Sequence, residues 1–154
     1  MAGSPEQAAF EAFKAVFDAD TGSGGLQENA SGNNAYVGGG FRLADDPKRT
    51  SLPEWIAFDM PGDVERDVFG QGSSGSGRVE ATVNLHIYAK RDTSPTRVFG
   101  ILERVRQKFH GATLATTQGW AFSAKVHRVR GFKAAEADNT VHRVEQFIVS
   151  MRRS

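Results

Sequence analysis

The chain of 154 residues carries 19 Lys and Arg, 18 Asp and Glu, 17 Gly and no Cys. Its length suits one domain, and no apolar run approaches the roughly 20 residues of a membrane-spanning helix. Its first residues lack the basic start and apolar core of a signal peptide, so we expect a soluble protein made in the cytoplasm. The lack of cysteine excludes disulfides, thiolate zinc sites and a cysteine nucleophile.

The near-zero net charge conceals an asymmetry between the two parts of the chain. Residues 1–67 contain 12 acidic and 5 basic side chains, a balance of −7, whereas residues 68–154 contain 6 acidic and 14 basic ones, a balance of +8. Such a division is typical of nucleic-acid contact through the basic part, or of complementary surfaces on subunits that pack head to tail. Two separately solvated faces are the remaining interpretation.

A helix start is marked near the N-terminus. Ser4 is a good N-cap, Pro5 suits the first helical position, and Gln7 completes a pattern like a capping box, which predicts a helix over 5–19. Apolar residues follow at helical spacing on one stripe. These are Ala9, Phe10, Phe13, Val16 and Phe17.

Two segments are rich in glycine and turn-forming residues, about 21–50 and 70–77. We expect flexible loops there, which order against a partner. The candidate partner-contact residues are Gly38, Gly39, Gly40, Gly70, Gln71, Gly72, Ser73, Ser74, Gly75, Ser76 and Gly77.

The remaining patterning predicts strands around a second helix. Strands are expected over 54–59 and 64–69, and strict alternation of apolar and polar residues predicts a long strand over 78–89. Ser94-Pro95 begins a helix over about 95–110, and Gly111 follows it at the position where helices end. Two further strands are expected over 120–129 and 141–151.

This element order favours an α+β fold, in which a mostly antiparallel sheet is packed by the two main helices, 5–19 and 95–110. The strand over 141–151 carries apolar residues on both faces, which is typical of a strand covered on both sides or buried in a subunit contact. The candidate interface residues in it are Val144, Phe147, Ile148 and Val149.

Catalytic signatures are not found in the sequence. Gly70–Gly77 contains no useful nucleophile-elbow match, because it precedes a strand, and no phosphate-binding loop motif occurs. His86, His127 and His142 fall on three predicted strands and could meet at a metal, although solvated histidines are commoner on strands. We therefore expect no catalytic residues, no metal, no cofactor and no enzyme activity.

A nucleic-acid-binding module is an alternative that uses the basic C-terminal half, with Trp120 and Phe122 as stacking surfaces. Those aromatics alternate like core residues, however, and no binding signature accompanies them. The basic candidates are Lys125, His127, Arg128, Arg130, Lys133, Arg143, Arg152 and Arg153.

The segment from Arg78 to Lys133 resembles the tail-completion, or tail-terminator, proteins of long-tailed bacteriophages. The shared features are the long alternating strand 79–89, the amphipathic helix, and the Phe109-His110-Gly111 sequence followed by Leu114, in which Phe109 stands where the family has leucine. The early helix and the strand introduced by Leu52-Pro53 also agree. The segment 21–50 is longer and richer in Gly and Asn than the family pattern.

The resemblance implies a single tail-terminator-like domain over 1–154, which forms a ring with other copies of itself, six in all. That ring would cap the tail tube, stop its polymerisation and join it to the head connector, at the head–tail junction of the virion. The implied partners are the chain itself, the tail-tube protein and the connector protein, with no membrane and no specific nucleic acid. Another head–tail connector component remains an alternative.

Overall fold

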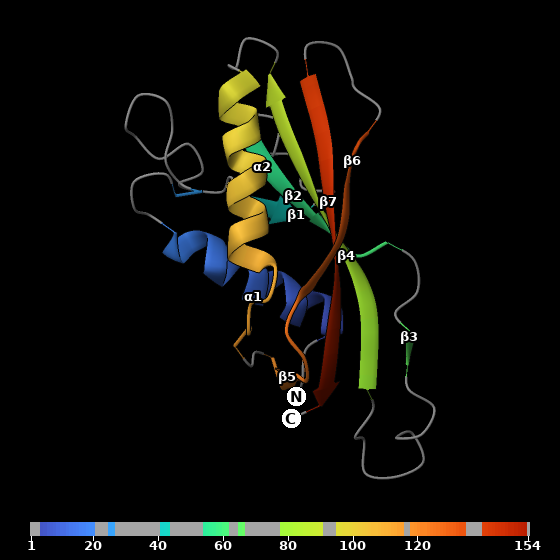
Figure 1. Cartoon of the computed structure of the whole chain (residues 1–154). Helices are drawn as coiled ribbons and strands as arrows, with labels where there is room; N and C mark the ends of the chain where they lie inside the picture. The colour runs from blue at the N-terminus through green and yellow to red at the C-terminus, as the bar shows by residue number, and fades with distance from the viewer. Residues whose placement is uncertain are drawn as a thin grey trace.

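The computed structural model describes residues 4–20, 25–26, 41–43, 54–61, 65–66, 78–90, 95–115, 118–134 and 140–153. Two helices and seven strands occur in these ranges (Figure 1). In chain order they are α1 (Pro5–Ala19), β1 (Phe41–Leu43), β2 (Glu54–Asp59), β3 (Glu65–Arg66), β4 (Arg78–Lys90), α2 (Pro95–Phe109), β5 (Trp120–Phe122), β6 (His127–Lys133) and β7 (Thr140–Arg153).

The strands form one mixed sheet in the order β1-β2-β4-β7-β5, with β3 added to β4 and β6 added to β7. Every pairing is antiparallel except that of β1 with β2. The whole of β4 pairs with β7, from Arg78 opposite Arg152 to Lys90 opposite Thr140, and this ladder is the axis of the sheet. The α+β prediction is therefore confirmed.

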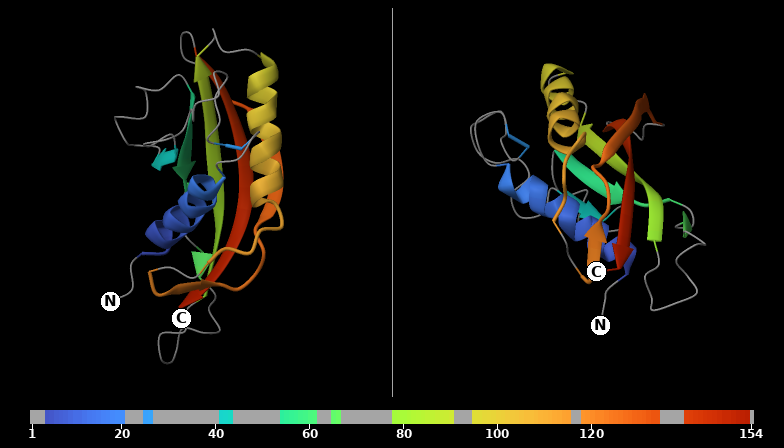
Figure 2. Two further views of the ribbon diagram at one scale, coloured as in Figure 1. Left: turned by 90° about the vertical axis from the view of Figure 1, so that its left-hand side faces the viewer. Right: turned by 60° about the horizontal axis from the view of Figure 1, so that its bottom comes forward.

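Both helices lie on one face of the curled sheet. Viewed onto that face, α1 crosses the β2 side and α2 runs along the β6 and β7 side (Figure 2, left). The ring of Phe13 joins the layers, because it stacks on Phe109 of α2 at 4.9 Å between centroids and meets the edges of Phe58 and Phe147 at 5.6 and 6.3 Å. These four side chains are at most 2% exposed.

The predicted helix boundaries are confirmed. The Ser4 hydroxyl accepts a hydrogen bond from the Gln7 N–H at 3.1 Å, and the Gln7 side chain donates to Glu11. At the end of α2, Gly111 has φ +74°, the left-handed conformation that favours glycine after a helix. No helix in the described ranges is long and apolar enough to cross a bilayer.

One strand prediction is wrong. The expected strand over 120–129 is two strands, β5 and β6, separated by residues 123–126, and β6 continues to Lys133. The chain leaves the sheet because Val126 bonds to the end of α2 instead, with its N–H on Ala112 O at 2.9 Å and its C=O on Gly111 N–H at 2.7 Å. The Arg128 N–H then donates to His110 Nδ1 at 3.0 Å, so the Phe109-His110-Gly111 segment is tied to the start of β6.

Asp20, which caps the C-terminus of α1, joins that helix to α2. It is only 4% exposed, and Arg104 donates to both its oxygens at 2.6 and 2.9 Å, while the Leu26 N–H donates at 2.8 Å. Burial alone would raise the pKa of Asp20, but these donors, together with the charges of Arg104 and Lys108, outweigh it and lower the pKa below 3.8.

Replacement of Asp20 by Asn should lower the free energy of unfolding at pH 7 by about 2–4 kcal/mol, because the buried Arg104 contact loses its charged partner. Because the pKa of Asp20 is lower in the folded chain than the unfolded value of 3.8, the stabilisation by its charge is complete above pH 3.8. It is lost as the pH falls through the pKa of the folded state. Urea titrations of both chains at pH 7 and near pH 3 should therefore converge at acid pH. Asp18→Asn, which breaks the exposed pair with Lys14, should cost less than about 1 kcal/mol.

Candidate assembly surfaces

Most of the two predicted contact loops lies outside the described residues. Within 21–50 the structure describes residues 25–26, with Leu26 buried, and the strand β1, so this segment is not a loop throughout. Gly38, Gly39 and Gly40 lie outside the described residues, as does the whole of 70–77. Their proposed role in binding partners stays a prediction.

The predicted interface strand is β7, and its residues divide between the two faces of the sheet. Phe147 and Val149 point to the helices and are at most 1% exposed within the subunit core. Val144 and Ile148 belong to the opposite face, with Val144 1% exposed and Ile148 half-buried. Of the four predicted residues, only the latter pair lies on the side away from the helices.

That opposite face carries an aromatic ladder across three strands. Trp55 of β2, Tyr88 of β4 and His142 of β7 lie directly opposite one another in register. Their rings stack, with centroids 5.0 Å apart for the Trp55–Tyr88 pair and 4.2 Å for the Tyr88–His142 pair. Cross-strand aromatic pairs of this kind stabilise a sheet. Trp55 is buried, and its indole Nε1 has no hydrogen-bond partner among the described residues.

Two of the three strand histidines meet beside this ladder. His86 Nδ1 lies 2.8 Å from His142 Nε2, and His86 Nε2 lies 3.6 Å from an Asp59 oxygen. Burial of His86 and the neighbouring His142 lower the pKa of His86 below 6.5, although Asp59 acts in the opposite direction. His127 is not part of this pair and lies beside His110, at 5.3 Å between ring centroids. No group of three or more metal-binding side chains occurs in the described ranges.

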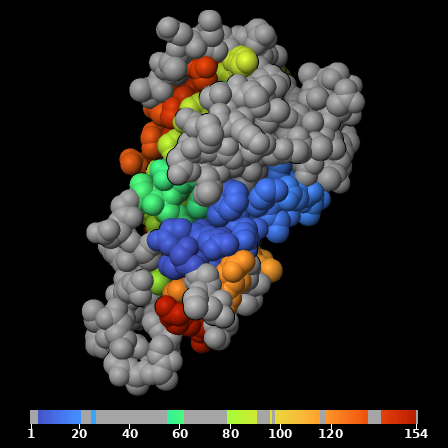
Figure 3. Space-filling view, turned by 180° about the vertical axis from the view of Figure 1, so that it is seen from behind, coloured from blue at the N-terminus to red at the C-terminus, as the bar shows by residue number. Residues whose placement is uncertain are grey.

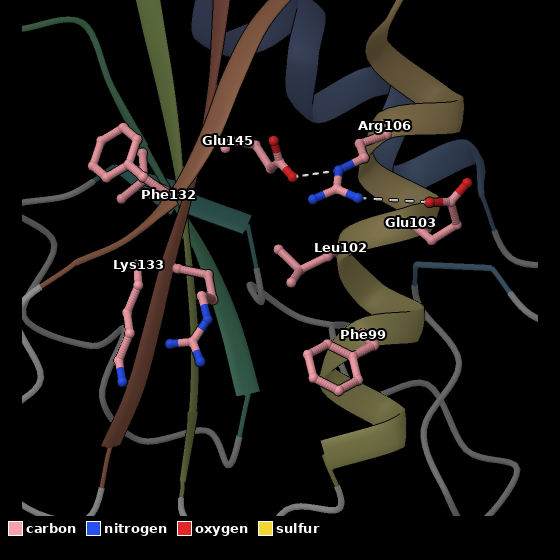
Figure 4. A pocket seen from close by; sticks show the side chains of 10 residues that line it. Phe99, Leu102, Glu103, Arg106, Phe132, Lys133 and Glu145 are labelled. Atoms are coloured by element: carbon pink, nitrogen blue, oxygen red, sulfur yellow. Dashed lines mark hydrogen bonds and ion pairs between the residues drawn. The ribbon is translucent and has the colours of Figure 1, made fainter.

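A groove of about 480 Å³ lies between α2 and the strands β6 and β7 (Figure 4). Phe99 and Leu102 project into it from α2, and Lys133 runs along the strand side, whereas the Phe132 ring points away from α2. Its charged lining consists of three cations and two carboxylates, which are Arg106, Lys133, Arg143, Glu103 and Glu145.

The floor of the groove is closed by Glu145, which is 0% exposed. One carboxylate oxygen accepts from Arg106 Nε at 2.6 Å and the other from Arg128 Nε at 2.8 Å. Gly131 allows this approach, because a Cβ there would lie 2.6 Å from the Glu145 carboxylate. Both carboxylate oxygens are therefore occupied by arginines, and Glu145 holds α2, β6 and β7 together.

The rim of the groove carries Phe99, which is 61% exposed, next to Gly100 in the body of α2. Our reading of the sequence missed this pair. The apolar stripe of the helix contains Val98, Ile101, Leu102, Val105 and Phe109. Phe99 falls outside that stripe, and this position, together with a glycine inside a helix, is the signal that could have indicated a surface site.

The stacking surface expected for a nucleic-acid-binding module is not formed by Trp120. Its side chain is 1% exposed in the core, since β5 pairs with the end of β7 and turns the indole inward. Arg153 lies over that ring, with its guanidinium carbon 5.0 Å from the centroid. Arg128 is engaged by the buried Glu145.

Comparison with known proteins gives a structural similarity only. A chain in the structure described as the virion of native gene transfer agent (GTA) particle superposes with a TM-score of 0.66 at 14% identity, covering 95% of this chain and 96% of that one. No protein-family model and no curated protein matches the sequence. At this identity the similarity shows a shared fold along nearly the whole chain.

The histidine pair should make stability depend on pH. Because the pKa of His86 is lower when folded than its unfolded value of 6.5, its contribution is complete above pH 6.5 and is lost as pH falls towards the folded value. Unfolding free energies measured from pH 8 to 5 should decline in wild type and decline less in His86→Gln. Equal slopes in the two chains would contradict the assignment.

Gly131→Ala should reduce the free energy of unfolding by about 1–3 kcal/mol, because the added methyl group collides with a carboxylate that two arginines hold in place. Thermal unfolding measures the change. Alanine normally stabilises a strand relative to glycine, so an unchanged or raised melting temperature would show that Glu145 moves aside freely.

Proposed function

We propose that this chain is a structural, non-enzymatic subunit of a phage-type virion. The observation that supports it most is the shared fold with a virion chain, which extends over 95% of this chain and 96% of the other. The proposed location is the assembled particle.

We further propose that the subunit forms a ring, of six copies, that caps the tail tube at the head–tail junction. The ring ends tube polymerisation and joins the tail to the head connector. Support comes from the sequence resemblance to tail-terminator proteins over 78–133, and from the tie between Phe109-His110-Gly111 and β6, which gives the resembling segment a structural role.

Closure of a ring needs two different surfaces on each subunit, one that meets the other on its neighbour. The charge balance of −7 over residues 1–67 and +8 over residues 68–154 suits such a contact. The loops 21–50 and 70–77 are the proposed contacts with the tube and the connector.

The purified chain, mixed with polymerised tail-tube protein, should form rings that are visible at tube ends by negative-stain microscopy and measurable by light scattering. Added during tube growth, it should shorten the tubes as its concentration rises, because capped ends no longer grow. A monomer that leaves tube length unchanged would contradict the proposal. Steeply salt-dependent binding to DNA would instead favour the nucleic-acid-binding alternative.

A further inference from the structure

We propose that the groove surface, defined as Phe99 and Gly100 on α2 with the cationic groove beside β6, receives the outward flank of α1 from a second copy of this chain. The contact is head to tail. This inference deepens the ring proposed above and rests on it, since it names the two surfaces that meet between neighbouring subunits.

The first observation is the exposure of Phe99. Its side chain is 61% exposed, the largest exposure of the big apolar side chains in the described part of the chain, and it stands at the mouth of a groove of about 480 Å³. Leu102 continues the apolar wall inward (Figure 4). An exposed aromatic beside a pocket is typical of the anchor of a protein–protein contact.

The second observation is Gly100, the neighbour of Phe99. Glycine in the interior of a helix is unfavourable relative to alanine, and it is retained where something must approach closely. Among the residues that the structure describes nothing does, because a Cβ at Gly100 would have no atom within 4 Å. A partner that packs directly on the helix backbone at this position would explain the glycine, which no contact among the described residues requires.

The third observation is charge. Arg106 pairs with both carboxylates of the lining, Glu145 and Glu103, so Lys133 and Arg143 give the groove its net positive charge. An occupant that complements this lining is acidic. The outward flank of α1 carries Glu11 and Asp18 around Lys14, which leaves it net negative. Asp18 pairs with Lys14, and Glu11 accepts hydrogen bonds from Gln7 and Gln118.

The positions of the two helices allow the contact to be repeated from copy to copy. α2 and the groove lie on the β6 and β7 side of the helical layer, whereas α1 lies on the β2 side (Figure 2, left). From behind, α1 is exposed across the middle of the molecule, next to β2 (Figure 3). When a surface on one side of each copy binds a different surface on the other side of the next, the interface is heterologous, and it forms a ring if the rotation between copies closes.

The test uses variants of the whole chain, examined by analytical ultracentrifugation with and without tail-tube protein. Phe99→Ser removes the anchor, and Gly100→Ala fills the approach site while making the helix intrinsically more favourable. Both should weaken self-association at least tenfold, and Gly100→Ala should do so with an unchanged or higher melting temperature, so misfolding cannot explain the loss. Gln107→Ala, on the exposed surface near the other end of α2, is the matched control and should associate like wild type.

Complementation tests the head-to-tail geometry. Glu11→Lys/Asp18→Lys reverses the charge of the α1 flank and should also prevent assembly, since each copy then lacks one surface. Mixed with Phe99→Ser, it should form a 1:1 dimer, because the intact groove of one chain meets the intact α1 of the other. Raising the salt concentration should weaken both this dimer and the wild-type assembly.

The failures of the two proposals are distinguishable. If wild type forms rings and both groove variants form them equally well, the groove inference is overturned while the ring stands. Two defective variants that do not complement each other also overturn it. If wild type stays monomeric with and without tubes, the proposed function falls, and this inference falls with it.

Discussion

The carboxylate of Glu145 lies in the interior with no exposed surface, and a buried carboxylate is tolerated only where charged donors surround it. Arg106 reaches it from α2 and Arg128 from β6, on one oxygen each. Three elements are therefore fixed by one side chain of β7, and Gly131 must lack a side chain so that β6 can pass beside it. These two ion pairs fix α2 against β6 and β7, and the groove lies above Glu145 between the helix and the strands.

A second charged contact joins the two helices within the helical layer. Asp20 ends α1 and is held by Arg104, so that α1 is fixed to α2 while Phe13 fills the space between both helices and the sheet. Arg104 and Arg106 belong to the same turn of α2 and point to different partners. The helix α2 therefore contacts α1 on one flank and β6 and β7 on another. Phe99 and Gly100, near its N-terminal end, remain on the surface.

The two faces of β7 show what the apolar pattern of a sequence can predict and what it cannot. Its mixed apolar pattern predicted burial on both sides, and Val144 is indeed buried on the face away from the helices. The pattern could not tell Phe147, which lies in the core within one chain, from a residue at a subunit interface, because both require apolar side chains. Nor could it reveal Glu145, since an acidic residue in a strand is ordinarily solvated and becomes tolerable inside only when two arginines distant in sequence arrive there.

The sequence by itself determined the elements and their class. Capping residues, Gly111 and strict alternation over 78–89 are local signals, so they specified both helices and the long strand without help from the rest of the chain. Only the tertiary structure decided the break between β5 and β6, the separation of His127 from His86 and His142, and the groove beside α2. Each of these depends on strand pairing and on charges brought together across long sequence separations, and such pairing leaves no periodic signature in the residues that make it.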